Sequence, residues 1–470
     1  MARRIILLLG VVLLLGVVSN AFAVDYYWDD ETGDHRIMTG ANWNPDNPPF
    51  PSNDGWLVVN NVPAYPGIGA VMDVDQDGNL AWGIAIGNPS GEGNLTVTDG
   101  GVMRSRGDFR VGKVNDGVVD LDGYIGVGGK AYLGEDGGSA TINVTGPNSA
   151  LNVYGYHTRL YAGIGNYTGS TCTINISDGY VRSKEWLLIG ASPGCTAVVN
   201  MTGGELLQTD RAGNRVSYIG NWGDGTLNIS GGEVYMRARM DISRFTTDQN
   251  QVGPWEDSYG HIEMTGGKIT ADHPYFEVNA KTMNWPVPEV RGTIHQTAGE
   301  FLFTKSGTLA YNRVNQAVHR GWWTTAPKHR LLYWQDGEGT HVIVEPPLEV
   351  DLDILPSDDP NLLTVNTQGK GRLPIAIYAS EEYDINQINL VSLHIGDTTF
   401  PVRVPVIDKD VNGDGLIDLM IHYSRRDVIL ALGLDTMEPG TIVPVTVEGV
   451  MNDGRVVLGT DNVVLVARED

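Results

Sequence analysis

A short strand-and-turn pattern recurs over about half of the chain, and it constrains the fold more than any other feature of the sequence. In each copy apolar residues alternate with polar ones, and most copies end in Ser or Thr followed by a Gly or Asp turn. Recurrence at such short intervals predicts a β-solenoid with coils of about 20 to 30 residues. The copies are LTVTDGG (95–101), VDLDG (119–123), INVTG (142–146), INISDG (174–179), VNMTGG (199–204), LNISGG (227–232), IEMTGG (262–267) and IHQTAG (294–299).

A second marker, an apolar residue followed by Gly, runs in phase with the first. Its members are Ile86-Gly87, Val111-Gly112, Leu133-Gly134, Ile164-Gly165, Ile189-Gly190 and Ile219-Gly220. Each coil should therefore hold at least two short strands separated by Gly-rich corners. The 60 glycines in 470 residues, close to twice the usual share, agree with this interpretation.

Strand alternation predicts which side chains face inward. Stacked coil on coil, the apolar positions form one continuous column. Asn143, Asn175, Asn200 and Asn228 lie between them and should form a polar ladder on the outer face. Asp120, Asp122 and Glu263 are charged exceptions there, and we expect no acid or base at the same register one coil away. The inward residues are Leu95, Val97, Ile142, Val144, Ile174, Ile176, Val199, Met201, Leu227, Ile229, Ile262 and Met264.

The repeat region, 83–310, resembles the autotransporter-associated and related β-strand repeats of bacterial secreted proteins. The opening is also similar to theirs, with Trp28, Gly33, Ala41-Asn42-Trp43, Pro48-Pro49 and Asp54 in a loose order that often starts such chains. The resemblance implies a right-handed parallel β-helix, although the residues themselves do not give the winding sense. The tail does not look like an autotransporter transport barrel, so self-secretion is not implied.

The first 23 residues have the character of an export signal. Arg3 and Arg4 precede a 14-residue apolar run, and Ala21-Phe22-Ala23 provides a cleavage site. The run is short for a membrane span, which needs about 20 residues. Neither of the 2 cysteines lies near this site, so we expect no lipid attachment there. A net charge of -25 disfavours binding to nucleic acid or anionic lipid.

A different module begins after Glu345-Pro346-Pro347. The β-rich segments LPIAIYA (373–379), TIVPVTVEGV (441–450) and VVLVA (463–467) predict a small antiparallel β-sandwich. The stretches 350–380 and 408–423 resemble a C-terminal module common in secreted bacterial proteins, which pairs a "DPN" phrase with a DVNGDG loop. The expected divisions are a signal peptide (1–23), an N-terminal capping segment (24–82), β-solenoid repeats (83–310), a C-terminal cap and linker (311–346) and the β-sandwich with its loop (347–470).

The DVNGDG loop is the sharpest chemical feature of the chain. Asp410, Asn412, Asp414, the backbone carbonyl of Leu416, and Asp418 alternate as hard oxygen ligands, and this spacing predicts a Ca²⁺ site. Position 12 of the loop is Ile421, so the loop is no standard helix-loop-helix hand. The alternative is an Asp/Gly turn without an ion, and Asp408 just upstream is either a further ligand or solvated. A second run, Asp73, Asp75 and Asp77, favours a plain turn.

Aromatic and sulfur residues leave two questions open. Tyr26, Tyr27 and Trp28 at one end of the repeats, and Trp322, Trp323, Tyr333 and Trp334 at the other, suit caps over open coil ends or platforms for sugar stacking. We favour caps, because both clusters flank the repeats. Cys172 lies six residues before Asp178 and Cys195 eight before Gly203, so a bridge between neighbouring coils is conceivable in an oxidising compartment. A two-residue stagger can stretch the Cα separation beyond the ~7 Å limit for a disulfide, so the bridge and two free thiols are equally open alternatives.

The sequence as a whole predicts an exported, non-enzymatic structural or adhesive β-solenoid at a bacterial cell surface or in an extracellular matrix. The partners would be copies of the chain or extracellular polysaccharide, and Ca²⁺ would stabilise the tail. Parallel β-helices also carry polysaccharide lyases and hydrolases, so a carbohydrate-active enzyme or a carbohydrate-binding protein is the alternative. Against an enzyme, the repeated strand carries Asn, Thr and Ser outward, without the paired carboxylates that such chemistry needs. Ligand identity and oligomeric state stay open.

Overall fold

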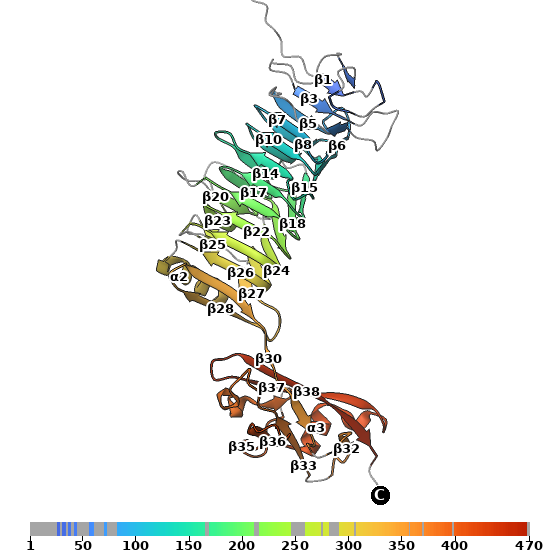
Figure 1. Cartoon of the computed structure of the whole chain (residues 1–470), viewed down its shortest axis with the longest axis vertical. Coiled ribbons are helices and arrows are strands. Elements are labelled where there is room, and N and C mark those ends of the chain that lie inside the picture. Colours follow the sequence, from blue (N-terminus) through green and yellow to red (C-terminus); the bar gives the residue numbers. More distant parts are fainter. Residues whose placement is uncertain are drawn as a thin grey trace, which may run out of the picture. The chain divides into compact units, whose positions relative to one another are not determined.

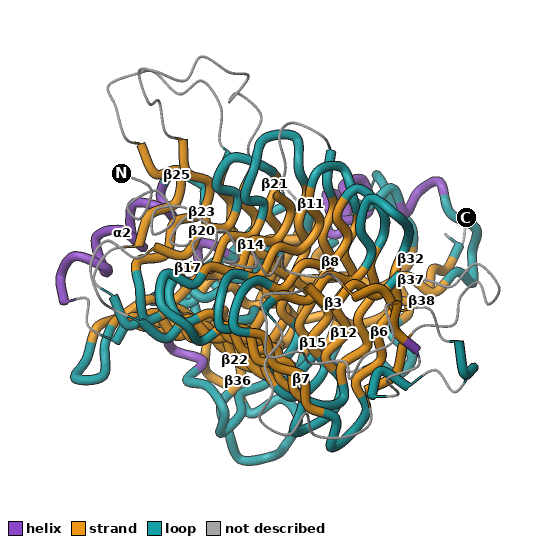
Figure 2. Tube along the Cα trace, turned by 90° about the horizontal axis from the view of Figure 1, so that it is seen from above, coloured by secondary structure: helices purple, strands orange, loops and turns teal. Residues whose placement is uncertain are grey.

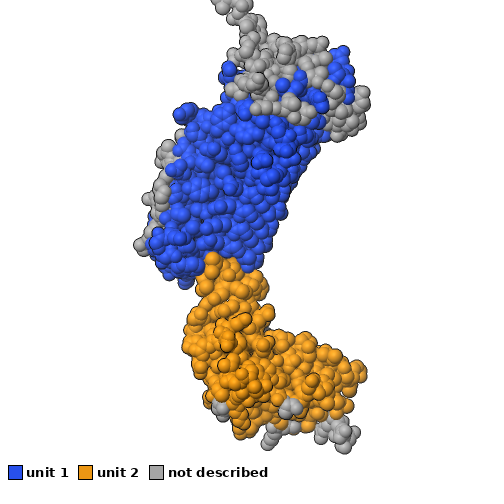
Figure 3. All heavy atoms as spheres, viewed as in Figure 1, with its two compact units in different colours: residues 1–324, 333–342 blue, residues 325–332, 343–470 orange. Residues whose placement is uncertain are grey.

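A computed structural model describes most of the chain as two compact units. The first unit comprises residues 1–324 and 333–342, and the second 325–332 and 343–470 (Figure 3). The expected signal peptide, Pro48-Pro49, Asp54 and the Asp73–Asp77 run lie outside the described residues. The structure describes residues 26–28, 31–33, 36–38, 42–44, 56–60, 70–72, 82–164, 169–210, 216–245, 259–273, 276–281, 291–304, 307–356, 358–368, 371–396 and 399–467.

The first unit is a parallel β-solenoid whose coils contribute strands to three faces (Figure 1). Each strand of the first face pairs in parallel with the strand one coil away. Strands dominate the described chain and helices are short (Figure 2). The first face consists of β3 (Trp56–Val59), β5 (Gly83–Ile86), β8 (Phe109–Lys113), β11 (Ala131–Glu135), β14 (Arg159–Ile164), β17 (Trp186–Ile189), β20 (Val216–Ile219), β23 (Arg239–Phe245) and β25 (Phe276–Lys281).

The second and third faces follow in each coil and merge at the C-terminal end, where single long strands serve both. The second face holds β4 (Ala70–Met72), β6 (Gly93–Val97), β9 (Gly117–Leu121), β12 (Ser139–Val144), β15 (Thr171–Ile176), β18 (Thr196–Met201), β21 (Asp224–Ile229), the first halves of β24 (Gly260–Ala271) and β26 (Gly292–Phe303), and β27 (Trp323–Thr324). The third holds β7 (Val102–Ser105), β10 (Tyr124–Val127), β13 (Ala150–Val153), β16 (Tyr180–Ser183), β19 (Glu205–Gln208), β22 (Glu233–Met236), the second halves of β24 and β26, β29 (Thr340–Glu345) and β28 (Arg330–Gln335).

The predicted apolar column is present on the second face. Ile142, Ile174, Val199, Leu227 and Ile262 are partners in register from coil to coil. Every one of them is 0% exposed. The core of the unit is thus a stack of equivalent side chains, because strand alternation sends every second residue inward.

The predicted asparagine ladder forms on the outer side of the same face. Asn175 Nδ2 donates to Asn143 Oδ1 (2.8 Å), Asn200 Nδ2 to Asn175 Oδ1 (2.9 Å) and Asn228 Nδ2 to Asn200 Oδ1 (2.8 Å). The ladder has a direction, since each amide donates to the preceding coil. It ends at Asp120, which accepts from Asn143 Nδ2 at 2.7 Å. A carboxylate fits that end because it needs only to accept.

One expectation about this face is wrong. Glu263 does have a base at the same register, because β24 and β26 align Glu263 with His295. His261 lies two residues before Glu263 on the same strand, and its Nε2 is 3.3 Å from Glu263 Oε2. The polar ladder therefore changes from amides to titratable groups in its last two coils.

Left-handed glycines make the corners after the first face, and they correct one member of the second marker. Gly87, Gly112, Gly134, Gly163, Gly190 and Gly220 all have positive φ. In the fourth coil the equivalent pair is Ala162-Gly163, because Ala162 is in register with Leu133 and Ile189. Gly165 lies outside the described residues. Ser243 (φ 53°) holds the same corner after Ile242, a conformation that non-glycine residues seldom adopt.

Aromatic side chains occupy both ends of the solenoid. At the N-terminal end, β1 (Tyr26–Trp28) pairs with β2 (Trp43–Asn44), which places Trp28 opposite Trp43. Trp43 is 0% exposed, and its Nε1 donates to the Ile37 carbonyl at 2.8 Å. At the other end, α2 (Gly307–His319) contacts β25 and β27, and Trp323 is buried against Phe301. These contacts agree with the expected capping role of Trp28 and Trp323.

The two cysteines do not form a bridge. Cys172 and Cys195 are both buried free thiols. Cys172 is in register with Ala140 and Ala197, so its in-register neighbour one coil on is Ala197 and not Cys195. Burial raises the pKa of Cys172 to about 12, which keeps the thiol protonated and unreactive.

The second unit encloses its own core between two sheets. Its larger sheet is mixed, because β30 and β32 run parallel to β38, so the expected all-antiparallel module is wrong in this respect. Side chains of both sheets share one apolar core, including Ile375, Ile421 and Val445. The sheets comprise β30 (Leu348–Glu349), β32 (Leu362–Thr364), β34 (His394–Ile395), β37 (Ile442–Val450) and β38 (Val456–Val466), and β31 (Leu352–Ile354), β33 (Arg372–Ile377), β35 (Val406–Lys409) and β36 (Asp418–Ser424); the helices are α3 (Arg425–Ala431), η3 (Ile385–Gln387), η4 (Leu390–Ser392) and η5 (Leu434–Thr436).

Candidate functional site

A column of large polar side chains runs along the outer side of the third face. Tyr180, Glu205, Glu233, Lys268 and Glu300 are partners in register on five successive strands. Each directly follows a glycine of positive φ, namely Gly179, Gly204, Gly232, Gly267 and Gly299. In these five coils the same turn thus recurs and places the next side chain at the same outward position. We call this column, together with His341 and Trp334 beyond it, the third-face track.

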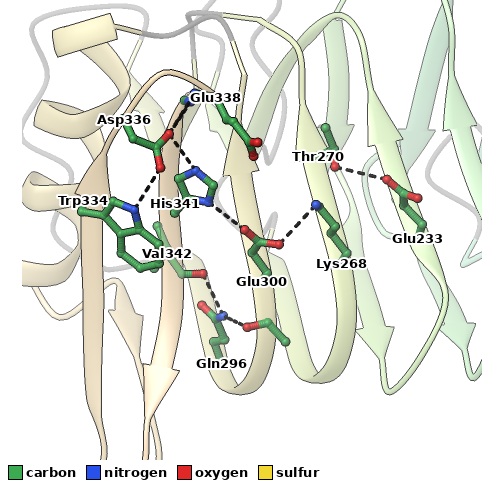
Figure 4. A network of polar contacts seen from close by, with 12 residues as sticks. Glu233, Lys268, Thr270, Gln296, Glu300, Trp334, Asp336, Glu338, His341 and Val342 are labelled. Atoms are coloured by element: carbon green, nitrogen blue, oxygen red, sulfur yellow. Dashed lines mark hydrogen bonds and ion pairs between the residues drawn. The ribbon is translucent and has the colours of Figure 1, made fainter.

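The C-terminal end of the track is a connected network of charges (Figure 4). Lys268 Nζ is 3.2 Å from Glu300 Oε2. Glu300 Oε1 lies 2.8 Å from His341 Nδ1, and His341 Nε2 lies 3.1 Å from Asp336 Oδ1. Thr270 Oγ1 donates to Glu233 Oε1 at 3.3 Å. Four strands and the turn before β29 are therefore joined by side-chain contacts.

His341 is the buried centre of this network, with 6% of its surface exposed. Burial alone would lower the pKa of His341, but the hydrogen bonds to Glu300 and Asp336 outweigh it and raise that pKa. In the same way burial would raise the pKa of Glu300, whereas hydrogen bonds from His341 and Lys268 lower it. Backbone N–H groups, first that of Glu338, lower the pKa of Asp336. The arrangement favours an imidazolium between two carboxylates.

Trp334 differs from the other aromatic residues at this end. Its ring stacks on His341 with centroids 4.9 Å apart and an interplanar angle of 3°. Its Nε1 donates to Asp336 Oδ2 at 3.3 Å, and 40% of the residue stays exposed. Tyr333, by contrast, donates its hydroxyl to Asn315 Oδ1 of α2 at 2.6 Å. The aromatic cluster expected to cap the solenoid thus separates into supporting residues and one exposed ring.

A depression of about 400 Å³ lies at the other end of the track. Tyr180, Glu205 and Glu233 line it, together with Asp178 and the corner glycines. Those glycines cannot be replaced without a clash, because a Cβ on Gly232 would lie 2.4 Å from the Gly204 carbonyl oxygen. Close stacking of bare backbone therefore makes the hollow beside the track.

A second charged cluster joins the first face to α2. Arg239 bonds Asp241 Oδ1 (2.6 Å) and Glu277 Oε2 (2.7 Å), and Arg313 of α2 reaches Glu277 Oε1 (3.2 Å). Asp241 is 0% exposed, and its Oδ2 has no hydrogen-bond partner among the described residues. Burial outweighs Arg239 and raises the pKa of Asp241 to about 6. Two carboxylates balanced by two guanidinium groups suit a structural role.

The predicted calcium loop is well ordered around its own backbone. Asp410 accepts from the N–H groups of Gly413 (2.7 Å) and Gly415 (2.9 Å), and Asp414 accepts from Leu416 N (2.8 Å). Asn412 Nδ2 donates to Asp414 Oδ2 at 2.9 Å.

Asp418 sits apart from the other loop acids. It is 0% exposed and accepts from Val411 N and Ala379 N, at 2.7 and 2.8 Å. The side chain of Asp408 lies outside the described residues. Within the described ranges, no group of three or more His, Cys, Asp or Glu side chains is arranged to hold a metal ion. The loop's donors are nevertheless all oxygens, which suits a hard cation.

The third-face track was missed by the sequence analysis, which followed the strand before each corner and not the residue after it. The signal was present: the residue after the corner glycine is Tyr180, Glu205, Glu233, Lys268 and Glu300 in successive copies. The contribution of His341 and Trp334 had no such signal, because they come from a hairpin outside the repeats.

Comparison with known proteins gives one informative match. The chain is 34% identical over 172 residues to the "Uncharacterized lipoprotein YdeK" of Escherichia coli (strain K12). The match covers 36% of this chain and 10% of that protein, so the chain spans only a small part of its relative. No family model matches the chain, and no solved structure does. None of the helices in the described ranges has the length and apolar character needed to cross a bilayer.

Proposed function

We propose that this chain is an exported, non-enzymatic structural or adhesive β-solenoid of a bacterial cell surface or extracellular matrix. The observation that carries the proposal is the coil-to-coil register of the parallel strands, which makes a regular surface along the first unit. Such repetitive scaffolds present extended binding surfaces. The similarity to a lipoprotein supports an exposed location. We further propose that the coils wind in the right-handed sense usual for parallel crossovers, and that the tail is a β-sandwich.

Location is tested by expressing the tagged full chain in a bacterial host that exports it. Cell fractionation, protease shaving of intact cells and antibody labelling should all place the chain outside the cytoplasm, at the cell surface or in the surrounding matrix. A variant with Arg3, Arg4 and the apolar run deleted serves as the control and should stay inside the cell. Retention of the intact chain in the cytoplasm would overturn the proposal.

We also propose that the tail binds Ca²⁺ through Asp410, Asn412, Asp414, the Leu416 carbonyl and Asp418. A divalent cation would offset the repulsion that arises when three carboxylates gather around one site, so Ca²⁺ binding should stabilise the folded loop. Thermal melting of the full chain in Ca²⁺ and in chelator should show a higher melting temperature of the second unit with Ca²⁺. The shift should vanish in Asp414→Ala and persist in the control Asp435→Ala, an exposed acid outside the loop. An equal melting temperature in both solutions would refute the site.

A carbohydrate-active enzyme is the second candidate, favoured by one pair of residues. Glu205 and Glu233 are in register on adjacent strands, about 4.8 Å apart at the backbone, and line the depression. Glycosidases need two carboxylates at roughly 5 to 9 Å. Incubation with a polysaccharide panel should release reducing ends if this pair is catalytic, and Glu233→Gln should abolish the release. Absence of any product supports the non-enzymatic proposal.

A further inference from the structure

We infer that the third-face track, from Tyr180 to Trp334, binds a neutral polysaccharide chain laid along the solenoid. The inference deepens the proposed adhesive function by naming the class of ligand and the residues that hold it. The track contains an aromatic platform at one end, a hollow with a tyrosine at the other, and both hydrogen-bond donors and acceptors between them.

The platform is Trp334. One face of its indole is covered by His341, and the hydrogen bond from its Nε1 to Asp336 fixes the orientation of the ring. The ring loses little freedom when a ligand arrives, because these contacts already hold it. Flat aromatic faces beside precisely placed polar groups are a usual way to hold a small organic ring. Asp336 provides a carboxylate at the rim of the platform (Figure 4).

The middle of the track offers both kinds of hydrogen-bonding group. Lys268 and Thr270 are donors, while Glu233 and Glu300 are acceptors. Thr270 is buried, with 7% of its surface exposed, but the side chains of Lys268 and Glu300 are 39% and 30% exposed, so part of each of these two stays accessible to a ligand. A polysaccharide presents hydroxyl groups that both donate and accept along its length. The presence of both donors and acceptors along the track fits that chemistry.

The length and hollow of the track fit a chain-like ligand. Tyr180 and Trp334 lie on the first and last of seven neighbouring strands, which are β16, β19, β22, β24, β26, β29 and β28. At about 4.8 Å per strand the track is about 29 Å long. The corner glycines run beside its first five strands and have no side chains there. A ligand of several sugar units can therefore lie against it.

The charges on the track determine which class of polysaccharide it can bind. Glu205, Glu233, Glu300 and Asp336 are acidic, whereas Lys268 and His341 each already contact a carboxylate. The track therefore has no cation left to pair with the uronate or sulfate groups of an acidic polysaccharide, which the surplus carboxylates repel. A neutral polysaccharide is not repelled by these carboxylates, and its hydroxyl groups can form hydrogen bonds with the track.

The test uses affinity electrophoresis of the full chain in gels that contain xyloglucan, mixed-linkage β-glucan, polygalacturonate or chitosan. Retardation is expected in at least one neutral glucan and not in polygalacturonate. Trp334→Ala should weaken that binding about tenfold, the scale of one good aromatic contact. Glu233→Gln should weaken it less, since the amide still accepts one hydrogen bond. Trp82→Ala is the matched control, because Trp82 is 46% exposed and lies outside the track.

Melting curves of each variant distinguish lost binding from lost folding, and Trp334→Phe, which keeps a ring, should retain most of the binding. Equal binding by Trp334→Ala and the parent, binding to polygalacturonate or chitosan alone, or no binding to any of the four would overturn the inference. Failure here leaves the proposed surface location standing, since fractionation tests that independently. A chain that stays in the cytoplasm but still binds neutral glucan would overturn the proposed location and leave the proposed binding by the third-face track standing.

Discussion

Replacement of Trp323 by Ala should destabilise the C-terminal end of the solenoid more than any other single aromatic change in that region. Trp323 is 1% exposed, and its ring meets Phe301 edge-on at 4.6 Å and Phe276 at 6.0 Å. Its Nε1 donates to the side chain of Gln296, which is itself 0% exposed. The substitution therefore removes a large ring and one partner of a buried amide together.

The expected cost follows from those two losses. Truncation of a buried Trp to Ala costs about 3 to 5 kcal/mol through lost burial and the cavity that remains. An unpartnered buried carbonyl on Gln296 adds about 1 to 3 kcal/mol. Trp323→Phe loses the donor and the pyrrole part of the indole but keeps a six-membered ring in the site, so it should cost less than half as much. Trp322→Ala should cost about 1 kcal/mol, because Trp322 is only partly buried and Arg320 lies over its ring.

Urea unfolding followed by far-ultraviolet circular dichroism gives the global free energy, and hydrogen exchange resolves where the loss falls. Coils of a solenoid contact mainly their neighbours, so exchange should accelerate in β26, β27 and α2 before it does in the central coils. A loss below about 1 kcal/mol for Trp323→Ala, with unchanged exchange in these elements, would show that Trp323 does not cap the solenoid.

Three further predictions concern polar groups. His341→Gln should remove a pH dependence of the stability of the last coils. The pKa of His341 is raised above its ordinary 6.5 in the folded chain, so the stabilisation that protonated His341 provides is complete below pH 6.5 and declines as the pH rises through the folded value. Melting curves from pH 5 to 9 would detect this decline. Asp241→Asn should remove a loss of the same sign in a more acidic window: the pKa of Asp241 is raised from 3.8 to about 6, so the stability of the parent declines as the pH rises between these values, and a variant that declines equally would contradict this. Asn200→Ala breaks two ladder hydrogen bonds and should lower the free energy of unfolding in urea by about 1 kcal/mol. Asn200→Asp keeps only the acceptor and should cost at least as much. An unchanged free energy of unfolding in both variants would mean that the ladder adds no stability.

The second face could be predicted well because the residues that determine it lie close together in the sequence. Alternation of apolar and polar residues fixes which side chains turn inward, and equal turns keep successive copies in register. Ile174, Val199 and Leu227 therefore fall where the pattern placed them. The pairing of Trp28 with Trp43 could be anticipated only in part, since an antiparallel pair depends on a loop that carries no repeat.

Local pattern failed where the chain departs from its own repeat. In the fourth coil both Gly163 and Gly165 follow apolar residues, and only the register with Leu133 and Ile189 shows that Gly163 is the corner. In the last coil a bulge shifts the pairing after Met264, so that Ala298 aligns with Thr265. Both departures have one cause: a motif gives candidates for a position, and hydrogen-bond pairing with the neighbouring coils selects one of them.

The third-face track lies between these cases, and it shows what a repeat motif conceals. Residues that vary among copies look uninformative when copies are aligned to find what they share. The position after each corner glycine holds Tyr180, Glu205, Glu233, Lys268 and Glu300, so it contributes nothing to the motif. Stacking nevertheless brings these five side chains to one line on the surface. In a solenoid the constant positions build the scaffold, and the variable position at a fixed register is where a chain can carry its own specificity.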